Sequence, residues 1–447
     1  MEHLSENAAL VRESPDTMRR VAVVGGGIAG LGAAWLIGQR HHVTLFEAGD
    51  DFGGHSNTVD VTLEGRTAPV DTGFLVHNTL TYPLLVKMFE HLGVPTRDTD
   101  MSFAVSLERP ELEWAGTNLA TVFAQRRNLV RPAFLRMLRD ILRFNRMAPD
   151  YLAQARGTPL TLGELLAREG YGAAVRDWYL LPMAAAIWSS SVAAILDFPA
   201  QTFLTFCLNH RLLQVNDRPQ WRTVVGGSRE YVRRLVDALG VQSARHTLRV
   251  STPVESVARR PGAVWLHSKR HGTEKFDAVV LACHSDQALA LLSDAGPLER
   301  ELLGAVRYAP NEAWLHTDRS LLPRRESTWS AWNFMAAEGQ HGSSPVAVSY
   351  WLNRLQELPF ESPVVVTLNP PREPAAASVL GRYAYAHPQF DRAAVEAQRR
   401  LPTTQGDRQT WFCGAWTGYG FHEDGLRSAV DVARDFGVQP PWESAHG

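Results

Sequence analysis

A glycine-rich turn near the start of the chain constrains the fold more than any other feature. The apolar run at residues 21–24 leads into three consecutive glycines, and a run of small residues follows from Ile28. A second apolar run, His42–Phe46, ends at Glu47. A strand, a tight turn, a helix and a second strand ending in an acid form the βαβ unit of dinucleotide-binding proteins. The sequence therefore predicts an α/β fold whose Rossmann-like domain contains a parallel sheet.

The glycines of this turn have separate physical roles. Gly25 lets the chain turn sharply out of the strand, and Gly27 has no Cβ that would block a pyrophosphate. Gly30 lets the helix pack closely on the sheet. The first N–H groups of the helix, at Ile28 and Ala29, then face the ligand with the positive end of the helix dipole behind them.

The acid at the end of the second strand supports the same interpretation. Glu47 lies 20 positions after Gly27 and is followed by Ala48. A carboxylate at this place accepts hydrogen bonds from ribose hydroxyls. An accidental glycine-rich turn is the alternative, and the order of strand, turn, helix, strand and acid disfavours it.

Composition excludes several classes of protein. The chain has 447 residues and a formal net charge of −2, which gives no reason to expect nucleic acid as a partner. Its three cysteines, Cys207, Cys283 and Cys413, lie far apart in apolar runs, as buried thiols of a reducing compartment do. No stretch has ~18 uninterrupted apolar residues. We expect a cytoplasmic protein without a metal site. Peripheral contact with the inner face of the membrane is a further expectation.

The rest of the chain divides into segments with different patterns. Residues 19–80, 223–300 and 401–439 are predicted to form the dinucleotide-binding domain. Residues 81–222 are mainly helical in pattern and interrupted by prolines. Residues 301–400 contain stretches in which apolar and polar residues alternate, which predicts a mostly antiparallel sheet in a substrate domain.

Three separated motifs carry a resemblance that covers nearly the whole chain. They are residues 25–47, the paired glycines with Thr58 four positions later, and residues 414–429. Together they resemble the two-domain flavoproteins of the amine oxidase, phytoene desaturase and protoporphyrinogen oxidase group. Longer phrases, such as DMSFAVS, LNHRLLQ and FCGAWTGYGFHEDGL, resemble the oxidoreductase half of plant cyclopropane fatty acid synthases and its free-standing bacterial relatives.

The resemblance implies FAD bound without a covalent link. Glu47 would hold the adenosine ribose, Gly27 and Gly30 the pyrophosphate, and the Val254 backbone the adenine. The remaining contacts to the phosphates, the ribityl chain, the isoalloxazine and the second helix N-terminus are implied for Gly54, His55, Thr58, Gly73, Phe74, Gly414, Gly425 and Leu426.

One residue departs from the pattern of the group. Members usually carry an arginine after the paired glycines, and here His55 stands in its place. A histidine neutralises the charge on a pyrophosphate less firmly than an arginine does.

Candidate catalytic residues are few, because flavin dehydrogenation needs little from protein side chains. His210 is the first candidate base, since it lies in an apolar helix; a histidine satisfied by neighbouring backbone is the alternative. His422 precedes a helix expected to begin near Gly425 and to face the flavin. Tyr419 is a candidate for stacking near the ring, with ordinary loop packing as the alternative.

A basic segment is the second informative feature. Residues 132–147 place Arg136, Arg139, Arg143 and Arg146 on one arc of a helix, with a second arc that is apolar. The apolar arc is predicted to hold Phe134, Leu135, Leu138, Ile141 and Leu142. Such a helix suits the surface of an anionic membrane. A core-facing helix with a solvated arginine face is the alternative.

These features lead to three hypotheses about function. The first is an FAD-dependent oxidoreductase that takes hydride from an apolar substrate, such as a methylated or cyclopropanated phospholipid acyl chain, with a cyclopropane-type fatty acid methyltransferase as functional partner. The second is an amine oxidase that produces hydrogen peroxide. Amine oxidases of the group usually carry a lysine in the second half, and none occurs here after Lys275. The third is a non-catalytic lipid-binding member of the fold.

Overall fold

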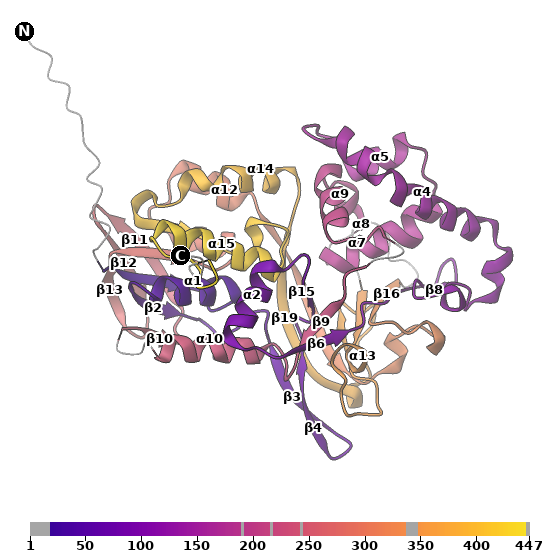
Figure 1. Ribbon diagram of the computed structural model, residues 1–447, viewed down its shortest axis with the longest axis horizontal. Helices are drawn as coiled ribbons and strands as arrows, with labels where there is room; N and C mark the ends of the chain where they lie inside the picture. The colour runs from indigo at the N-terminus through magenta and orange to yellow at the C-terminus, as the bar shows by residue number, and fades with distance from the viewer. Residues whose placement is uncertain (1–17, 189–191, 215–217, 242–244, 337–346, 444–447) are drawn as a thin grey trace, which may run out of the picture.

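The computed structural model describes residues 18–188, 192–214, 218–241, 245–336 and 347–443. Among these residues, a five-stranded parallel sheet in the order β10-β2-β1-β14-β20 collects segments from the whole length of the chain (Figure 1). Its strands are β1 (Arg20–Val24), β2 (His42–Phe46), β10 (Thr247–Arg249), β14 (Ala278–Leu281) and β20 (Thr410–Phe412). The predicted α/β fold with a parallel sheet is confirmed.

Helix α1 (Ile28–Gly38) is the centre of this domain. All of its residues are buried, because α10 (Arg229–Val241) and α15 (His422–Asp435) pack against it beside the sheet. Two glycines allow these close approaches. A Cβ added to Gly30 would lie 1.7 Å from the carbonyl oxygen of Gly25, and one added to Gly32 would lie 2.9 Å from Leu426.

A second, seven-stranded sheet forms the other domain, in the order β19-β15-β18-β17-β16-β7-β8. Neighbouring strands are antiparallel, except that β16 and β7 are parallel. The predicted mostly antiparallel sheet is therefore confirmed. Its strands are β7 (Phe103–Leu107), β8 (Leu112–Ala115), β15 (Arg307–His316), β16 (Trp332–Ala336), β17 (Ala347–Trp351), β18 (Val365–Leu368) and β19 (Val379–Gln389).

Two features of local structure differ from expectation. Residues 81–222 are mainly helical, as the pattern predicts, but β7 and β8 within them complete the seven-stranded sheet. The last helix begins at His422 and not near Gly425, because its first turn is fixed by the Asp424 carboxylate, which accepts a hydrogen bond from the backbone N–H of Phe421 (3.1 Å). The pattern missed β7 and β8 because short strands and short helices share the same apolar residues.

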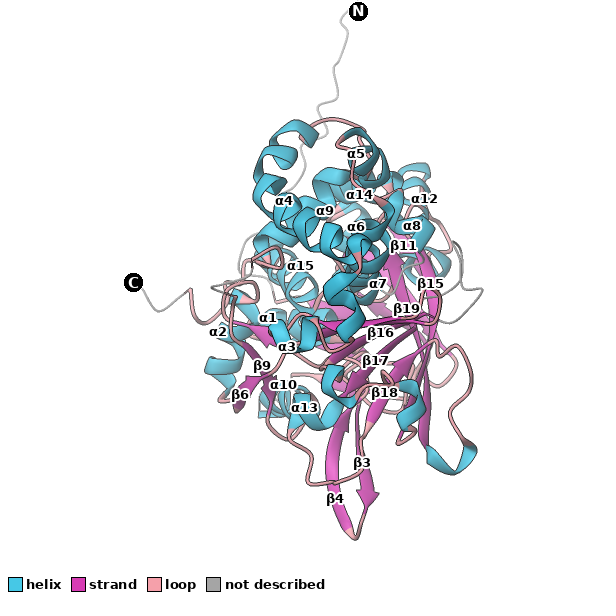
Figure 2. Cartoon of the chain, turned by 90° about the vertical axis from the view of Figure 1, so that its right-hand side faces the viewer, coloured by secondary structure: helices cyan, strands magenta, loops and turns pink. Residues whose placement is uncertain are grey.

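A helical region covers the end of the molecule opposite the parallel sheet (Figures 1 and 2). The long α4 (Pro132–Ala155) lies at its outer edge and packs on α9 (Ala200–Asn209). Further helices of this region are α5 (Leu162–Arg168), α6 (Ala173–Val175), α7 (Leu181–Trp188) and α8 (Val192–Leu196). Among the described residues no helix has the length and apolarity to cross a membrane.

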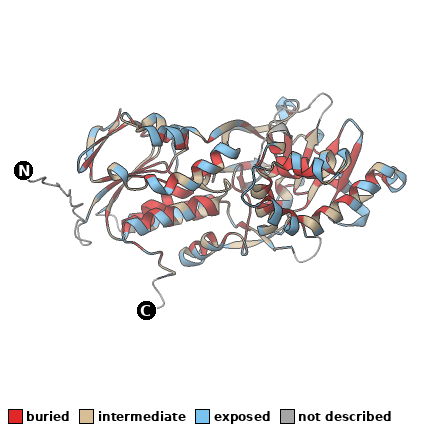
Figure 3. Cartoon of the chain, turned by 90° about the horizontal axis from the view of Figure 1, so that it is seen from above, coloured by how far each residue is buried: buried red, intermediate tan, exposed pale blue. Residues whose placement is uncertain are grey.

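The faces of α4 differ from the sequence prediction at two positions. Leu135 is 43% exposed and Leu142 is 60% exposed, although both were predicted on the same apolar arc as Phe134. Both lie instead between exposed arginines on the outer face, while Phe134 and Phe144 are buried. Figure 3 shows the same division of the helices into buried inner and exposed outer faces.

Smaller elements connect the domains. A hairpin of β3 (Thr58–Leu63) and β4 (Arg66–Asp71) projects from the molecule (Figure 1). The other elements that bear on the sites below are β5 (His77–Asn78), β6 (Thr96–Thr99), β9 (Trp221–Val224), β11 (Val254–Arg260), β12 (Ala263–Ser268), β13 (Gly272–Phe276), α2 (Pro83–Leu92), α11 (Ser285–Leu291), α12 (Pro297–Gly304), α13 (Leu352–Gln356) and α14 (Arg392–Arg400).

A buried carboxylate fixes the end of this hairpin. Asp71 accepts hydrogen bonds from the Ser228 backbone N–H (2.9 Å) and hydroxyl (2.7 Å), from the Thr58 hydroxyl (2.5 Å) and from Gln356 (2.8 Å). Burial raises the pKa of Asp71 to about 6, against the effect of these donors. The carboxylate thereby joins the hairpin to α10 and α13 and holds the loop that continues to Phe74.

We predict that Gly30→Ala destabilises the fold, because its Cβ would overlap the Gly25 carbonyl. The expected loss in the free energy of unfolding is ~1–3 kcal/mol or more, as for other overpacked sites. Chemical denaturation monitored by circular dichroism measures it. Gly240→Ala is the matched control, since a Cβ there meets no described atom within 4 Å and alanine is favoured over glycine in a helix. Equal stability of the two variants would contradict the prediction.

Candidate functional site

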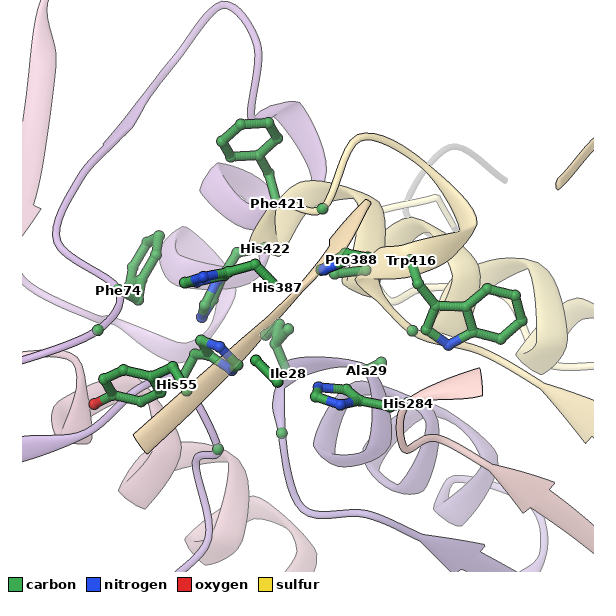
Figure 4. Close-up of a pocket in the computed structure, with 18 of the residues that line it drawn as sticks. Ile28, Ala29, His55, Phe74, His284, His387, Pro388, Trp416, Phe421 and His422 are labelled. Atoms are coloured by element: carbon green, nitrogen blue, oxygen red, sulfur yellow. The ribbon is translucent and has the colours of Figure 1, made fainter. Parts of the chain in front are cut away.

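A cavity of about 700 Å³ lies where the carboxyl ends of the parallel strands meet the second sheet and the helical region (Figure 4). Ligand sites of open α/β sheets occupy this place. The cavity has a glycine-rich end at β1, α1 and β2, and an apolar end at α7, α9 and the seven-stranded sheet. The two ends suit different parts of one large ligand, or a ligand and a substrate.

The N-terminus of α1 opens into the glycine-rich end. The helix starts after Gly27, and no side chain among the described residues caps it. The first intrahelical bond runs from the Leu31 N–H to the Gly27 carbonyl (2.9 Å), so the earlier N–H groups have no partner within the helix. A Cβ added to Gly27 would meet no described atom within 4 Å. This open helix end suits the two phosphates of a dinucleotide.

Glu47 lies at the end of β2, beside this helix terminus. Its carboxylate accepts hydrogen bonds from the backbone N–H groups of Gly26 (2.6 Å) and Gly49 (2.7 Å). These bonds fix the carboxylate in the cavity wall, with lone pairs left for ribose hydroxyls. Ala48 and Val254 line the same end, as an adenosine pocket requires.

His422 and Phe74 form the wall in the middle of the cavity. Their rings stack with centroids 3.9 Å apart. The Nε2 atom of His422 lies 2.8 Å from the Ser56 hydroxyl, which in turn bonds the Tyr231 hydroxyl. Burial, with a smaller contribution from His77, lowers the pKa of His422 to about 3. The imidazole is therefore neutral and positioned as part of a flat, rigid wall.

Three further histidines line the cavity near α1. They are His55, which follows Gly54, His284, which precedes α11, and His387 on β19 (Figure 4). The ring centroid of His55 lies 5.4 Å from that of His387 and 6.4 Å from that of His284. Burial lowers the pKa of all three, that of His387 to about 4.

The inner end of the cavity is apolar. Among the described residues that line it there, none is a lysine, an arginine or a carboxylate. His210 lies there, with its ring stacked on Phe206 (3.9 Å) and its Nδ1 atom 3.0 Å from the Phe206 carbonyl oxygen. The apolar and aromatic lining consists of Leu75, Val76, Tyr82, Met101, Ala186, Ile187, Phe206, Leu212, Trp221, Trp332, Tyr350 and Leu368.

Most of the residues proposed from the sequence come together in this one cavity. The lining includes Gly25, Gly27, Ile28, Ala29, Glu47, Ala48, Gly54, His55, Gly73, Phe74, Val254, Gly414, His210 and His422.

Five proposed residues lie outside the lining. Gly30 packs against the backbone of Gly25, and Thr58 donates its hydroxyl to Asp71. Gly425 and Leu426, expected at the flavin, instead pack α15 against Ile28 and Gly32 of α1. Tyr419 packs on the Phe206 ring at 5.6 Å, away from the cavity surface.

Sequence reasoning missed two residues of the wall. His387 and Tyr385 lie on β19, whose irregular pattern of half-buried residues gives no clear alternation in the sequence. A third lining residue outside the sequence prediction is His284, which is the N-cap of α11. No local signal distinguishes His387 and Tyr385, because the pairing of β19 with β15 brings them to the cavity.

A family model decides the classification. The model described as flavin containing amine oxidoreductase matches residues 28–368, which is more than half of the chain. The chain belongs to this family. The protein is therefore a flavin-dependent oxidoreductase of the flavin-containing amine oxidoreductase family. No curated protein matches the sequence significantly.

Solved structures of other proteins share the fold at low identity. A fatty acid isomerase from P. acnes that produces CLA has a TM-score of 0.66 and 15% identity, and the match covers 95% of this chain and 100% of that one. Putrescine oxidase bound to putrescine has a TM-score of 0.65 and 16% identity, with 94% and 99% covered. Cyclohexylamine oxidase from Brevibacterium oxydans IH-35A has the same four values.

The cavity fits the flavin that the family uses. The uncapped helix end, the open space at Gly27 and the carboxylate of Glu47 form a cradle for a dinucleotide, which favours FAD over a mononucleotide. When bound, the flavin supplies two-electron oxidation of a substrate. The chain supplies a cradle for the phosphates, a flat wall at Phe74 and His422, and a water-excluding apolar end.

We predict that Gly27→Ala abolishes flavin binding without unfolding the protein. The added Cβ meets no described atom, but it enters the cavity in front of the helix N-terminus, where the phosphates would lie. We expect the purified variant to be colourless, with a melting temperature close to that of the wild-type apoprotein. Absorbance and differential scanning fluorimetry measure the two effects. A yellow Gly27→Ala variant with wild-type affinity would place the phosphates elsewhere.

Proposed function

We propose that this protein binds FAD without a covalent link and takes hydride from an acyl chain of a membrane phospholipid, desaturating or otherwise oxidising it. The observation that carries the proposal is the apolar inner end of the cavity, with its aromatic and aliphatic lining. Such a lining stabilises a bound hydrocarbon chain through the hydrophobic effect.

The charges at this end argue against an amine substrate. An alkylamine is an ammonium ion at neutral pH, and burying it without a counter-charge is costly. The one carboxylate among the described lining residues is Glu47, which belongs to the ribose end of the cavity. An amine oxidase that releases hydrogen peroxide therefore remains the second candidate. It is supported by the family and by the fold shared with putrescine oxidase.

His210 is the proposed base. A bound flavin would supply the acceptor for hydride from one carbon of the chain, and His210 would take the proton from the neighbouring carbon, so that a C=C bond forms. The His210 Nδ1 atom must donate to the Phe206 carbonyl, so Nε2 carries the lone pair that accepts this proton. Burial lowers the pKa of His210 to about 4, which keeps the ring neutral at physiological pH.

The outer face of α4 provides a second argument for a lipid substrate. Leu135, Arg139, Leu142 and Arg146 are spaced by four, three and four residues, so they form one stripe along the helix. The described chain has nine exposed large hydrophobic residues, and five of them lie between residues 119 and 142. These five are Leu119, Leu129, Val130, Leu135 and Leu142.

We call the stripe together with Leu129 and Val130 the α4 surface. Exposed leucines between arginines match an anionic bilayer, because the leucines enter the acyl region while the guanidinium groups meet phosphates. The opposite side of α4 packs on α9, which lines the cavity through Phe206. A lipid at this surface is thus one helix layer from the apolar end. We propose peripheral binding to the cytoplasmic face of the membrane.

The resemblance to the fused plant enzymes supports a methylated or cyclopropanated acyl chain as the substrate. Their oxidoreductase half is joined to a cyclopropane-type fatty acid methyltransferase. A methylated or cyclopropanated phospholipid made by such a methyltransferase is therefore the proposed substrate, and that enzyme is the proposed functional partner. The fatty acid isomerase is a further protein of the same fold whose name states a fatty acid substrate.

We predict that phospholipid vesicles with cyclopropanated or methyl-branched chains reduce the flavin under anaerobic conditions. The long-wavelength absorbance of the flavin should fall, and mass spectrometry should show lipids lighter by two hydrogens. Putrescine should leave the spectrum unchanged, because its ammonium groups have no counter-charge among the described residues at the inner end of the cavity. Bleaching by putrescine with no response to any lipid would overturn the lipid proposal and favour the amine oxidase.

We also predict binding to vesicles that contain phosphatidylglycerol. A Leu135→Gln/Leu142→Gln variant should bind at least about tenfold more weakly, since burial of each leucine contributes on the order of 1 kcal/mol or more. Arg139→Gln/Arg146→Gln should lose about 1 kcal/mol per arginine on anionic vesicles only. Cosedimentation measures both.

The matched control for this experiment is Leu298→Gln/Arg399→Gln, which changes an exposed leucine and an exposed arginine on α12 and α14. Binding of the control should equal that of the wild type. Equal binding by all variants, or no binding to anionic vesicles, would exclude the α4 surface as the contact while leaving the flavin site untouched.

A further inference from the structure

The histidine beside the N-terminus of α1 is the starting point. Residues Gly53 and Gly54 lie directly against the start of the helix: Gly27 and Gly53 form a β-bridge, and a Cβ on Gly54 would lie 3.2 Å from the Gly27 Cα. His55 follows at once. Its Nε2 atom is buried and has no hydrogen-bond partner among the described residues. A buried polar atom without a partner, next to an anion site, indicates a group whose hydrogen-bond partner is a bound ligand.

The groups around His55 carry no permanent positive charge. His387 and Tyr385 face it from β19, at centroid distances of 5.4 and 4.9 Å. His284 faces it from the start of α11, where Asp286 and Tyr308 are its own neighbours. His422 faces it from α15. The described lining contains neither lysine nor arginine, and its carboxylate and thiol belong to Glu47 and Cys283.

A hydrogen-bond chain fixes the proton of His387. The Glu312 backbone N–H donates to Asn369 Oδ1 (2.9 Å), so Asn369 Nδ2 donates to Asn311 Oδ1 (2.7 Å). Asn311 Nδ2 then donates to His387 Nδ1 (2.8 Å) and to the Ala309 carbonyl (3.0 Å). Because Nδ1 accepts, the proton of the neutral ring lies on Nε2. His387 is therefore a neutral donor, and a second proton would break its bond to Asn311.

The Nε2 atom of His55 has no hydrogen bond among the described residues that fixes its protonation. Its pKa is held well below the ordinary value of 6.5 by burial first, and then by His387, His284 and His422. In the cavity alone it is neutral at physiological pH. A buried diphosphate carries two negative charges, and a helix N-terminus offsets only about half a unit charge. The three histidines are too few and too dispersed for a metal, since the described residues contain no cluster that could hold one.

We propose that His55 takes up one proton when the diphosphate of FAD binds, with His387 as a second, neutral donor, so that cofactor binding is coupled to pH. This inference rests on the proposed FAD site. One proton moves from solvent to the imidazole, and no bond to the cofactor forms or breaks. His55 thus carries a positive charge only while the diphosphate is bound.

The direction of the pH dependence follows from linkage. A bound anion favours the protonated imidazole, so the pKa of His55 is higher in the complex than in the free protein. Affinity is greatest where the complex is protonated. The dissociation constant then rises by about tenfold per pH unit between the lowered pKa of free His55 and its pKa in the complex, and levels off above. FAD is therefore retained at slightly acidic pH and released more readily at alkaline pH.

The test titrates apoprotein with FAD between about pH 6 and pH 8.5 and follows flavin fluorescence. Calorimetry in phosphate and in Tris at one pH gives the number of protons taken up. We expect close to one proton and at least a tenfold rise in the dissociation constant over this range. His55→Gln should weaken binding at low pH and abolish the proton uptake. His55→Arg should abolish the uptake and keep tight binding at high pH, because its charge is permanent.

Two controls separate the possible failures. His271→Gln changes an exposed histidine in the turn between β12 and β13 and should behave as the wild type. ADP-ribose, which has the diphosphate but no flavin ring, should show the same proton uptake as FAD. Uptake with FAD but not with ADP-ribose, or equal uptake in His55→Gln, would overturn the assignment to His55 and the diphosphate. Absence of FAD binding at every pH would instead overturn the proposed cofactor site.

Discussion

The uncapped N-terminus of α1 is the constraint on which the rest of the structure depends. Helices leave their first N–H groups without partners, and burying such groups is costly unless another acceptor is present. Here the helix is buried along its whole length, and no described side chain caps it. A dinucleotide anion is the acceptor for which this arrangement is suited. The contact of Gly30 with Gly25 makes the arrangement possible, because it brings the helix end to the edge of the sheet.

The second sheet and the helical region convert this anion site into a site for oxidation. They close the cavity with aromatic and aliphatic side chains, and the helical region places His210 in its wall, while His422 comes from the start of α15. Both histidines are neutral because burial lowers their pKa values. The family membership establishes flavin-dependent oxidoreduction. The inner end is lined by apolar and aromatic side chains, an environment in which burial of an unpaired ion is costly.

The nucleotide half of the fold and of the site was largely predictable, because its signals are local. Residues 21–47 predicted a strand, a turn, a helix and a strand, and the structure contains them as β1, α1 and β2. The glycines, Glu47 and His55 could be located from spacing and from the family resemblance. Their roles follow from backbone geometry within short segments, which the sequence pattern records directly. Gly425 and Leu426 lie outside the lining and pack against α1, since an alignment with a helix start does not say which face of that helix packs inward.

The sequence alone therefore determined the class of fold, the dinucleotide cradle and the amphipathic α4. Tertiary structure decided which histidines share the cavity and which leucines of α4 face outward. His387 reaches His55 only because β19 pairs with β15 and the resulting sheet closes over α1, and 331 intervening residues leave no local trace of that contact. Leu135 and Leu142 are exposed because α9 covers the other side of α4. Contacts between distant segments depend on the packing of the whole chain, whereas a tight turn depends on the few residues that form it.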